Sequence, residues 1–294
     1  MIFCAVHYKR GEGAKMAIEN ASAVELPAAA DYDEIVQFIE TGYINAFHEA
    51  DFAKLRRLFH EDSLYFFTTR DGTLYKGAFD DDEVRGWAES EQDWEHTILS
   101  VTQAGDVASV ILEMRSKSDP GSAWVDIHAL LRIDGEWHDM NKTATHASRA
   151  DWAGAGEPAP GDPPDRDQIV RVAQLYIDGF NEADGEKLRE AFHPDAWIAF
   201  TDKAGDLHSH RIYDGIDDWG PDPGDPPIYG RIISVTQAGD VASVLLGFDW
   251  TPDPADGWVD IHSLLRLDGS WKIMNKTATH ASRAGWAAPE ASTA

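Results

Sequence analysis

The sequence predicts an α+β fold that is built twice in tandem. Three observations predict it. The chain has 294 residues, a length typical of two domains. Long segments of its first half return letter for letter in its second half. Within each half, apolar residues at helical spacing come first and strand-like alternation follows, which is the order of an α+β domain.

The repeat has a constant offset of 134 residues over its best-preserved part. Residues 100–110 return as 234–244, residues 124–128 as 258–262, and residues 141–150 as 275–284. A period of this length is that of a whole domain and not that of a solenoid repeat. We therefore expect a first domain at residues 31–150 and a second domain at residues 167–287.

The other segments are expected to be ends and a connection. Residues 1–30 form a leader that we expect to be disordered, and its first part is basic, unlike the rest of the chain. Met16 is an alternative start within this leader. Residues 151–166 are rich in proline and glycine, which is typical of a stiff and exposed linker. Residues 288–294 form a short tail.

Each copy opens with two predicted helices. Apolar residues recur at helical spacing on one face of the first helix: Val36, Ile39, Tyr43 and Phe47 in the first copy, and Ile169, Val172, Tyr176 and Phe180 in the second. An aspartate followed three positions later by Glu or Gln predicts a capping box at its start, at Asp31 and at Asp165. A second, short helix is expected after Asp51 and after Asp184.

After these helices the period of the pattern changes to two. Residues 64–69 and 196–201 are apolar and aromatic, which predicts a strand in each copy. Residues 80–91 predict a third helix in the first copy only, because the second copy has four prolines within residues 220–227. An antiparallel meander is then expected in the first copy, with strands at 98–103, 107–114, 124–133 and 137–145.

Three segments carry a resemblance to a known family. They are Phe-His-x-Asp after the second helix, the strand Gly-Asp-Val-Ala-Ser-Val, and the run Asp-x-x-x-Leu-Leu-Arg-x-Asp-Gly-x-Trp-x-x-x-Asn-Lys. With them the chain resembles the nuclear transport factor 2-like superfamily, and within it the lumazine-binding and SnoaL-like branch, over about residues 31–150 and 165–284. The superfamily contains isomerases, dehydratases, polyketide cyclases and non-catalytic binders.

The resemblance implies the shape of each domain. It implies two tandem cone-shaped domains, each a curved antiparallel sheet packed on two to three N-terminal helices, with a pocket inside the cone. Members of the superfamily commonly pair through their sheets. The resemblance therefore implies that the two copies form an internal pseudo-dimer, and it leaves further oligomerisation open.

The charge of the chain excludes two classes of partner. Its 25 basic and 52 acidic residues give a formal net charge of −27. A nucleic-acid-binding protein needs a basic face, and an anionic membrane surface repels such a chain. No apolar run has the roughly 18 residues that a membrane-spanning helix needs. We expect neither nucleic acid nor a membrane as a partner.

The acidic residues are spread along the chain, which predicts adaptation to high salt and a halophilic source. The alternative is an acidic protein that works at ordinary salt. Cys4 is the only cysteine, so an intrachain disulfide is excluded. This cysteine usage favours a cytoplasmic location.

The strongest candidate site lies on the strand at 124–133. One face of this strand is wholly apolar, whereas the other face carries Asp126 and His128. Asp260 and His262 repeat the pair in the second copy. An aspartate two residues from a histidine on one strand face can orient the imidazole, so these four residues are catalytic candidates for acid–base chemistry. The alternative is that this polar face meets solvent or the other domain.

Six residues are candidates for lining a ligand pocket: Tyr43, Trp124 and Asn141 in the first copy, and Tyr176, Trp258 and Asn275 in the second. The tryptophans share the strand face of the Asp–His pairs, and the tyrosines lie on the apolar helix face. Strict alternation along the last strand places Asn141 toward the helices, as it does Trp137, and directs Lys142 toward the domain–domain face. A purely structural role is the alternative for each of them.

No metal site and no cofactor are expected. His208 and His210 share one side of a strand, but a third ligand is not evident and the first copy has no equivalent. The sequence also lacks a phosphate-binding loop, a nucleophile elbow and a cysteine pair.

The function that the sequence favours is binding of a small apolar or aromatic ligand. The alternative is a cofactor-independent acid–base enzyme of the isomerase, dehydratase or polyketide-cyclase kind, which would use the Asp–His pair inside the cone. A third hypothesis is that the second copy serves only as a scaffold that stabilises the first.

Overall fold

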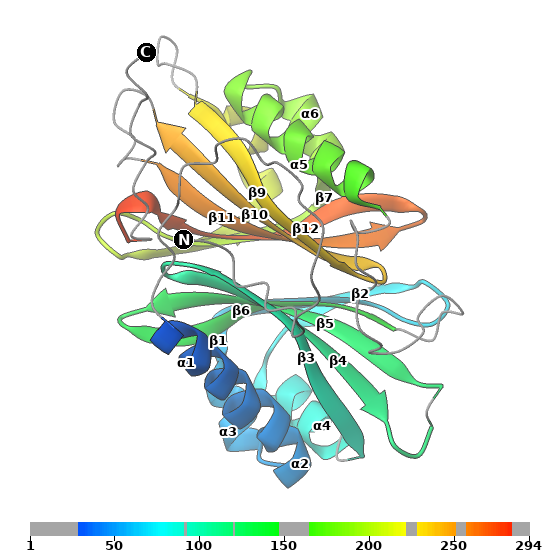
Figure 1. The fold of residues 1–294 in the computed structure, drawn as a ribbon. Helices are drawn as coiled ribbons and strands as arrows, with labels where there is room; N and C mark the ends of the chain where they lie inside the picture. The colour runs from blue at the N-terminus through cyan, green and yellow to red at the C-terminus, as the bar shows by residue number, and fades with distance from the viewer. Residues whose placement is uncertain are drawn as a thin grey trace, which may run out of the picture.

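The computed structural model describes residues 29–90, 93–119, 121–146, 165–221, 228–250 and 257–283. The expected tail and nearly all of the expected leader and linker lie outside the described residues. The described part contains one arrangement twice: helices first, then a strand pair, then a meander (Figure 1).

The first copy uses residues 29–146. Its helices are α1 (Ala29–Ile39), the π-helical turn η1 (Glu40–Ile44), α2 (Asn45–Glu49), α3 (Phe52–Leu58) and α4 (Asp81–Ser90). Its strands are β1 (Phe59–Thr68), β2 (Leu74–Ala78), β3 (Trp94–Ala104), β4 (Val107–Ser116), β5 (Ala123–Ile133) and β6 (Glu136–His146).

The second copy uses residues 165–283. Its helices are α5 (Arg166–Asn181) and α6 (Gly185–Ala191), and its 3-10 turns are η2 (Ile212–Asp214), η3 (Ile216–Asp218) and η5 (Ala281–Arg283). Its strands are β7 (Phe192–Thr201), β8 (Leu207–Arg211), β9 (Ile228–Ala238), β10 (Val241–Trp250), β11 (Trp258–Leu267) and β12 (Ser270–His280). None of the helices in the described ranges is long and apolar enough to cross a membrane.

Each copy forms one six-stranded sheet with the same strand order. The orders are β2-β1-β6-β5-β4-β3 and β8-β7-β12-β11-β10-β9. The predicted meander is confirmed, because β3 to β6 and β9 to β12 pair antiparallel in sequence order. Each sheet also contains one parallel pair, β1 with β6 and β7 with β12, which brings the first strand of each copy beside its last.

The predicted start of the second helix is confirmed in both copies. The side chain of Asp51 accepts a hydrogen bond from the backbone of Lys54, and Asp184 accepts two from the start of α6. The capping box expected at Asp165 is wrong, because its carboxylate accepts from Arg266 and Gln237 instead of from the helix backbone. The corresponding side chain of Asp31 lies outside the described residues.

The two copies differ where the sequence predicts that they differ. The first copy has the third helix, α4, which packs Val84 and Ala88 into the core. In the second copy two short 3-10 turns, η2 and η3, take this place and bury Ile212 and Ile216. Residues 222–227, which hold three of the four prolines of that stretch, lie outside the described residues.

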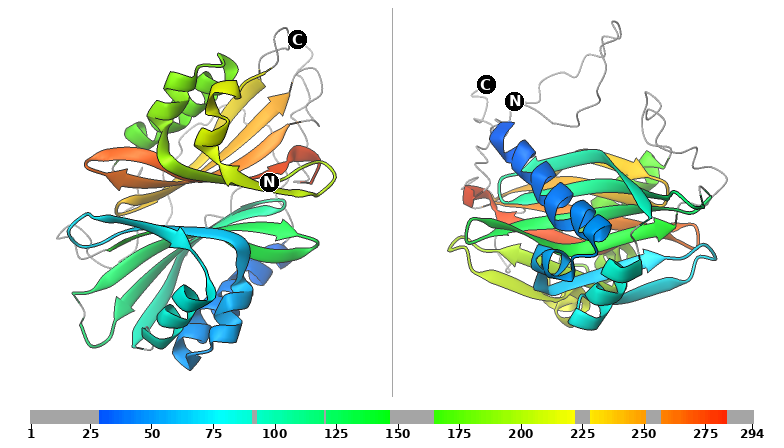
Figure 2. Two further views of the ribbon diagram at one scale, coloured as in Figure 1. Left: turned by 180° about the vertical axis from the view of Figure 1, so that it is seen from behind. Right: turned by 90° about the horizontal axis from the view of Figure 1, so that it is seen from below.

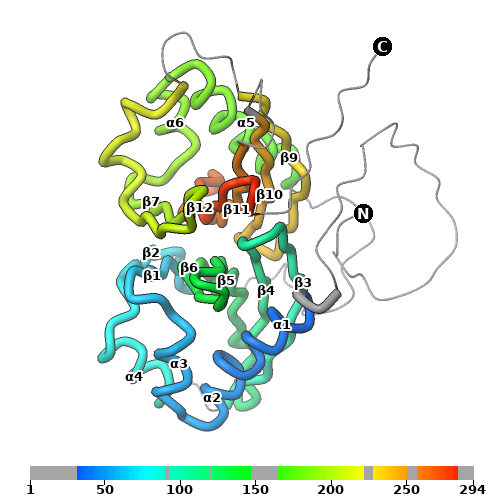
Figure 3. Tube along the Cα trace, turned by 90° about the vertical axis from the view of Figure 1, so that its left-hand side faces the viewer, coloured from blue at the N-terminus to red at the C-terminus, as the bar shows by residue number. Residues whose placement is uncertain are grey.

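The molecule has four layers (Figures 1 and 3). The two sheets face each other in the middle, and each carries its helices on its outer side. The view from below in Figure 2 shows α1 running across the sheet of its own copy. Each domain core lies between helices and sheet, with Tyr43 in one core and Tyr176 in the other. The apolar strand face predicted at 124–133 therefore faces the other domain, and the polar face looks toward the helices.

Two apolar clusters join the sheets, and each draws residues from both copies. One contains Ala104, Val107, Leu131 and Met140 with Ala199, Leu245, Val259, Ile261 and Ala281. The other contains Ala238, Val241, Leu265 and Met274 with Phe66, Ile111, Ala123, Val125 and Ile127. The four residues that the first copy gives to the first cluster have their repeat equivalents in the second cluster, which are Ala238, Val241, Leu265 and Met274. The two copies thus pack as an internal pseudo-dimer with the self-complementary interface of a twofold dimer.

Candidate functional site

Asp126 and His128 lie inside the first cone, fully buried. Residues directly opposite on paired strands point to the same side of a sheet. Leu130, two residues further along this face, is part of the core beneath the helices, and the ring of His128 meets the ring of Tyr43 from η1 edge-on at 4.4 Å. The alternative in which this face meets solvent or the other domain is therefore wrong for the first copy.

A tyrosine, an aspartate and a lysine form one polar cluster inside the first cone. The hydroxyl of Tyr43 donates to Oδ2 of Asp126 at 3.0 Å. Nζ of Lys142 lies 2.8 Å from the same oxygen and donates to the tyrosine hydroxyl at 2.6 Å. The indole of Trp87 from α4 covers this ammonium at 4.3 Å, so a helix of the outer layer closes the cluster. We call these three residues the first polar cluster.

The second cone repeats the cluster with the same residue types. The hydroxyl of Tyr176 donates to Oδ2 of Asp260 at 2.9 Å, and Nζ of Lys276 lies 2.8 Å from Oδ1 of that carboxylate. We call these three residues the second polar cluster. His262 is fully buried beside it, with Nε2 at 3.8 Å from Oδ2 of Asp260.

Burial and pairing compete in the second polar cluster. Burial acts to raise the pKa of Asp260, but Lys276 and His262 outweigh it and hold that pKa below its usual range. Burial lowers the pKa of Lys276, although Asp260 opposes the change. Burial and the neighbouring carboxylate both raise the pKa of Tyr176. The aspartate is thus held charged by a lysine that is itself removed from water.

The two histidines have different partners. Nδ1 of His128 lies 2.5 Å from Oδ2 of Asp139, and both side chains are fully buried. Burial raises the pKa of Asp139, although His128 opposes the change. The position of Asp139 in the first sheet is held by Ile273 in the second, since each pairs with the equivalent leucine and phenylalanine of its neighbouring strands. His262 therefore has no counterpart of this carboxylate.

The expected direction of Asn141 is wrong. A β-bulge at Met140 shifts the register between β5 and β6, so Asp139 and Lys142 both point into the cone while Asn141 points to the other sheet. The amide of Asn141 donates to the backbone carbonyl of Leu64 and accepts from Thr143, on the face that packs against the second domain.

The same correction applies to Asn275 in the second copy. The register shifts at Met274, which lies in an interface cluster, and Nδ2 of Asn275 donates to the hydroxyl of Thr277 at 2.8 Å. Strict alternation fails in both copies because one extra residue in the strand reverses the faces of all residues after it.

Trp124 and Trp258 are half-buried near the start of β5 and β11. The ring of Trp124 meets those of Phe67 and His146 edge-on, and Trp258 meets Phe200 and His280 in the same way. In the first cone, a series of contacting aromatic rings leads from Trp124 to Trp87 beside the first polar cluster. We call this series the aromatic wall, and it consists of Tyr65, Phe67, Tyr75, Trp87 and Trp124. In the second cone Ile198 stands where the first cone has Tyr65.

His96 is a site residue that the sequence analysis missed. It lies on β3 against His48 and Phe47, and neither of its ring nitrogens has a partner among the described residues. Burial lowers its pKa from 6.5 to about 4, and repulsion from His48 adds to the effect. The sequence repeat does not point to His96, because the second copy has Gly230 at the equivalent position of the sheet.

Asp139 and Lys276 are further site residues that the sequence does not predict. The expected direction of Lys142 toward the domain–domain face is wrong, because Lys142 completes the first polar cluster, as Lys276 completes the second. The Asp–His pairs do lie together inside the cones, but His128 hydrogen-bonds Asp139 and not Asp126. A catalytic role for Asp126, His128, Asp260 and His262 stays a prediction.

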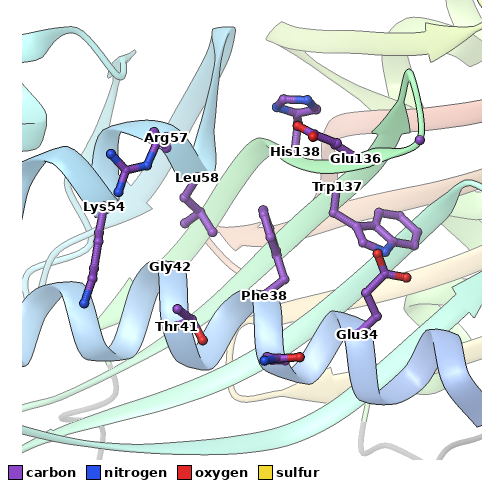
Figure 4. Close-up of a pocket in the computed structure, with 12 residues that line it drawn as sticks. Glu34, Phe38, Thr41, Gly42, Lys54, Arg57, Leu58, Glu136, Trp137 and His138 are labelled. Atoms are coloured by element: carbon purple, nitrogen blue, oxygen red, sulfur yellow. The ribbon is translucent and has the colours of Figure 1, made fainter.

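A separate groove lies on the outer side of the first domain (Figure 4). It has a volume of about 480 Å³ and runs between α1, α3 and the turn from β5 to β6. Phe38, Leu58 and Trp137 line it together with charged side chains of the rim. None of the predicted site residues lines this groove, so it is distinct from the polar cluster inside the cone.

Within the described ranges no three His, Cys, Asp or Glu side chains are gathered as metal ligands. The ring of His208 pairs with Asp202 at 3.1 Å and stacks on Phe200, so its position has a structural explanation.

No curated protein matches the chain. Among solved structures, an NTF2-like protein of unknown function from Methylobacillus flagellatus KT is 28% identical and covers 42% of this chain and 98% of its own, with a TM-score of 0.35. One from Shewanella baltica OS155 is 25% identical and covers 40% of this chain and 96% of its own, with a TM-score of 0.34. A ketosteroid isomerase-like protein from Erwinia carotovora atroseptica SCRI1043 is 19% identical and covers 37% of this chain and 90% of its own, with a TM-score of 0.28.

The family comparison covers most of the chain. The family described as "Putative lumazine-binding" matches residues 30–144 and again residues 164–278. These two matches coincide with the two helix-and-sheet units, and each contains all three residues of its polar cluster. The chain therefore belongs to the lumazine-binding family and carries the family's domain twice.

Proposed function

We propose that the chain binds a small aromatic ligand inside its cones, with a polar cluster at the inner end of each site. The observation that carries the proposal is that both cones bury a tyrosine and a lysine against an aspartate. Tyr43 and Tyr176 reach their aspartates at 3.0 Å and 2.9 Å, and both lysines lie 2.8 Å from a carboxylate oxygen.

A buried ion pair is poor evidence of stabilisation. Removing two charges from water costs more free energy than their attraction returns, and apolar side chains of similar size are often at least as stabilising. Such a cluster at the centre of an apolar cone is typical of a site that recognises a ligand's polar groups. The aromatic wall beside Lys142 gives the first cone a matching surface for a flat ring.

The family description names lumazine, and a pteridine of that kind suits these residues. It is planar, so it can stack between aromatic side chains. It also carries carbonyl oxygens and ring N–H groups, which pair with an ammonium donor and a carboxylate acceptor. We therefore place pteridines first among the ligands to be tested, followed by flavins, steroids and polyketide-like aromatics.

A thermal-shift screen in molar salt tests the proposal. A ligand at about 100 times its Kd adds about 2.7 kcal/mol to the free energy of unfolding, which gives a clear rise in Tm. Asp126→Asn and Asp260→Asn each remove one buried charge and keep the side-chain shape, so each cone is the control for the other. The proposal predicts a ligand-induced rise in Tm that each variant reduces. A shift that neither variant changes would contradict it.

We also propose that the chain is adapted to a salt-rich cytoplasm. Its net charge of −27 produces strong self-repulsion at low ionic strength, and molar salt reduces the screening length to about 3 Å. The proposal predicts that Tm rises steeply between dilute buffer and molar potassium chloride. A Tm that is independent of salt over this range would contradict it.

A further inference from the structure

The two cones differ in one buried charge. In the first cone Oδ2 of Asp139 lies 2.5 Å from Nδ1 of His128, and in the second cone Ile273 occupies the position of this aspartate. The polar clusters themselves are alike. The difference in buried carboxylates between the two cones therefore lies at the pair of His128 and Asp139, which we call the dyad.

Charge balance distinguishes the cones. In the second cone Lys276 and Asp260 cancel, and burial lowers the pKa of His262, so the buried groups sum to no net charge. In the first cone Lys142 and Asp126 cancel in the same way, and Asp139 adds a second carboxylate. If His128 were neutral, one negative charge would lie uncompensated in the core, which is strongly unfavourable. One extra proton on the dyad removes that charge.

We propose that the dyad keeps this extra proton, so that Nε2 of His128 is a hydrogen-bond donor that takes a carbonyl or carboxylate oxygen of the ligand in the first cone. This inference rests on the proposed function, because it names what the first cone binds. In the second cone Nε2 of His262 faces Oδ2 of Asp260 at 3.8 Å, so its N–H is directed at the carboxylate of the second polar cluster and not at a ligand.

The position of the shared proton does not change the conclusion. If it lies on Nδ1, the ring is an imidazolium and Nε2 also carries hydrogen. If it lies on Asp139, the carboxylic acid donates to Nδ1, and the neutral ring then carries its hydrogen on Nε2. Only a dyad without the extra proton leaves a lone pair on Nε2. Burial raises the pKa of Asp139, which favours retention of the proton.

Nε2 of His128 has no hydrogen-bond partner among the described residues although it is fully buried. A buried polar atom of this kind calls for a partner, and a ligand oxygen supplies an acceptor. The titratable groups around the dyad come from four elements: Tyr43 from η1, His96 from β3, Asp126 from β5 and Lys142 from β6. Lys142 lies directly opposite His128 on the same sheet face, so its ammonium and the imidazole lie on the same side of the sheet.

Nitrogen-15 NMR of the histidine side chains tests the assignment without any ligand. His128→Gln identifies the signals of His128. In the wild type at neutral pH, Nε2 of His128 should have the chemical shift of a protonated nitrogen. Asp139→Asn keeps the side-chain shape but removes the charge that the extra proton balances, so the ring of His128 should become a neutral imidazole with one protonated and one lone-pair nitrogen. The signals of His262 in the same sample are the internal control and should not move.

The converse variant adds the missing carboxylate to the second cone. In Ile273→Asp, Nδ1 of His262 should lose the shift of a free lone-pair nitrogen, because it shares a proton with the new carboxylate. Should this variant not fold, the comparison of wild type with Asp139→Asn decides alone. A lone-pair shift for Nε2 of His128 in the wild type, or no change in Asp139→Asn, overturns the inference.

Ligand titration separates this inference from the proposed function. Benzoate supplies a carboxylate oxygen on an aromatic ring, and toluene supplies the ring alone. Asp139→Asn should weaken benzoate binding by about tenfold and leave toluene binding unchanged. Equal benzoate affinity in wild type and Asp139→Asn overturns the donor role. If neither benzoate nor a pteridine binds, the proposed function fails, and the NMR experiment still decides the protonation of the dyad.

Discussion

At the scale of single residues, the unusual feature is a lysine held inside an apolar cone. The side chain of Lys142 is 10% exposed, and that of Asp126 is 0% exposed. Tyr43 donates to this carboxylate and accepts from this lysine, so the three groups satisfy one another. Their arrangement stays intact only while every member is present.

Removal of the lysine alone should be costly. We expect Lys142→Met to lower the free energy of unfolding by about 3–5 kcal/mol, because it leaves the buried carboxylate of Asp126 unpaired. The double variant Asp126→Asn with Lys142→Met should recover most of this loss, since no uncompensated charge remains. Urea denaturation of the three proteins measures both effects. If Lys142→Met were as stable as the wild type, the buried ion pair would not exist in solution.

His96 should make the first domain sensitive to acid. Its pKa is near 4 in the folded chain and near 6.5 when the ring is in water, because burial disfavours the charged ring. Between these values the unfolded chain binds the proton and the folded chain does not. The contribution of His96 to stability is therefore complete above pH 6.5 and is lost as the pH falls toward 4.

A variant isolates this contribution. His96→Gln should lessen the decrease in unfolding free energy between about pH 7 and about pH 4.5, by up to about 3 kcal/mol. Urea denaturation of wild type and variant at both pH values measures the difference. An identical pH dependence of the two proteins would show that the ring is open to water.

At the scale of elements, the order of helices and strands is predictable because it depends on local patterns. The caps at Asp51 and Asp184, the helix over residues 81–90 and the meander all follow from spacing within short segments. The proline-rich stretch of the second copy also correctly excludes α4 there.

Which residues of β6 enter the site depends on a β-bulge, and the alternation of apolar and polar residues in the sequence does not reveal it. The bulge at Met140 reverses the strand faces after it, which exchanges Asn141 for Lys142 inside the cone. Alternation correctly predicts that each Asp–His pair shares one strand face, because β5 and β11 precede the bulges. His96 and Trp87 come from elements that meet the cluster only in three dimensions, so sequence spacing contains no sign of their contact.

The helix α4 offers a test of the backbone around the site. Gly86 lies in α4 with open space where a Cβ would be, so Gly86→Ala should stabilise the chain by about 0.4–1 kcal/mol through a lower entropy of the unfolded state. In Gly42 a Cβ would lie 2.8 Å from a methyl group of the buried Leu58, so Gly42→Ala should destabilise the chain. Thermal denaturation of both variants measures the contrast. A loss of stability in Gly86→Ala would show that α4 is not helical there.

At the scale of the whole molecule, the interface between the sheets relates the two copies by a pseudo-twofold axis. Ile127 lies in one interface cluster and Ile261 in the other, and both are fully buried. The interface also has a polar rim, where Asp106 accepts from Arg283 and Asp62 accepts from Ser209. Contacts of this kind should make the two copies unfold together.

Equivalent truncations on the two sides should therefore have equal effects. We expect Ile127→Ala and Ile261→Ala each to cost about 2–5 kcal/mol, because each removes buried methyl groups and leaves a cavity between the sheets. Both variants should still unfold in one transition. Urea denaturation followed by tryptophan fluorescence measures cost and cooperativity. Two separate transitions, or a cost on one side only, would contradict the pseudo-twofold packing.

The central claim is that each cone holds one ligand site built on its buried aspartate. Equilibrium dialysis against a pteridine, in molar salt, counts those sites directly. With the wild type, Asp126→Asn, Asp260→Asn and the double variant, we expect two, one, one and no ligands bound per chain. The same stoichiometry in all four proteins, or no binding to the folded wild type, would contradict the claim.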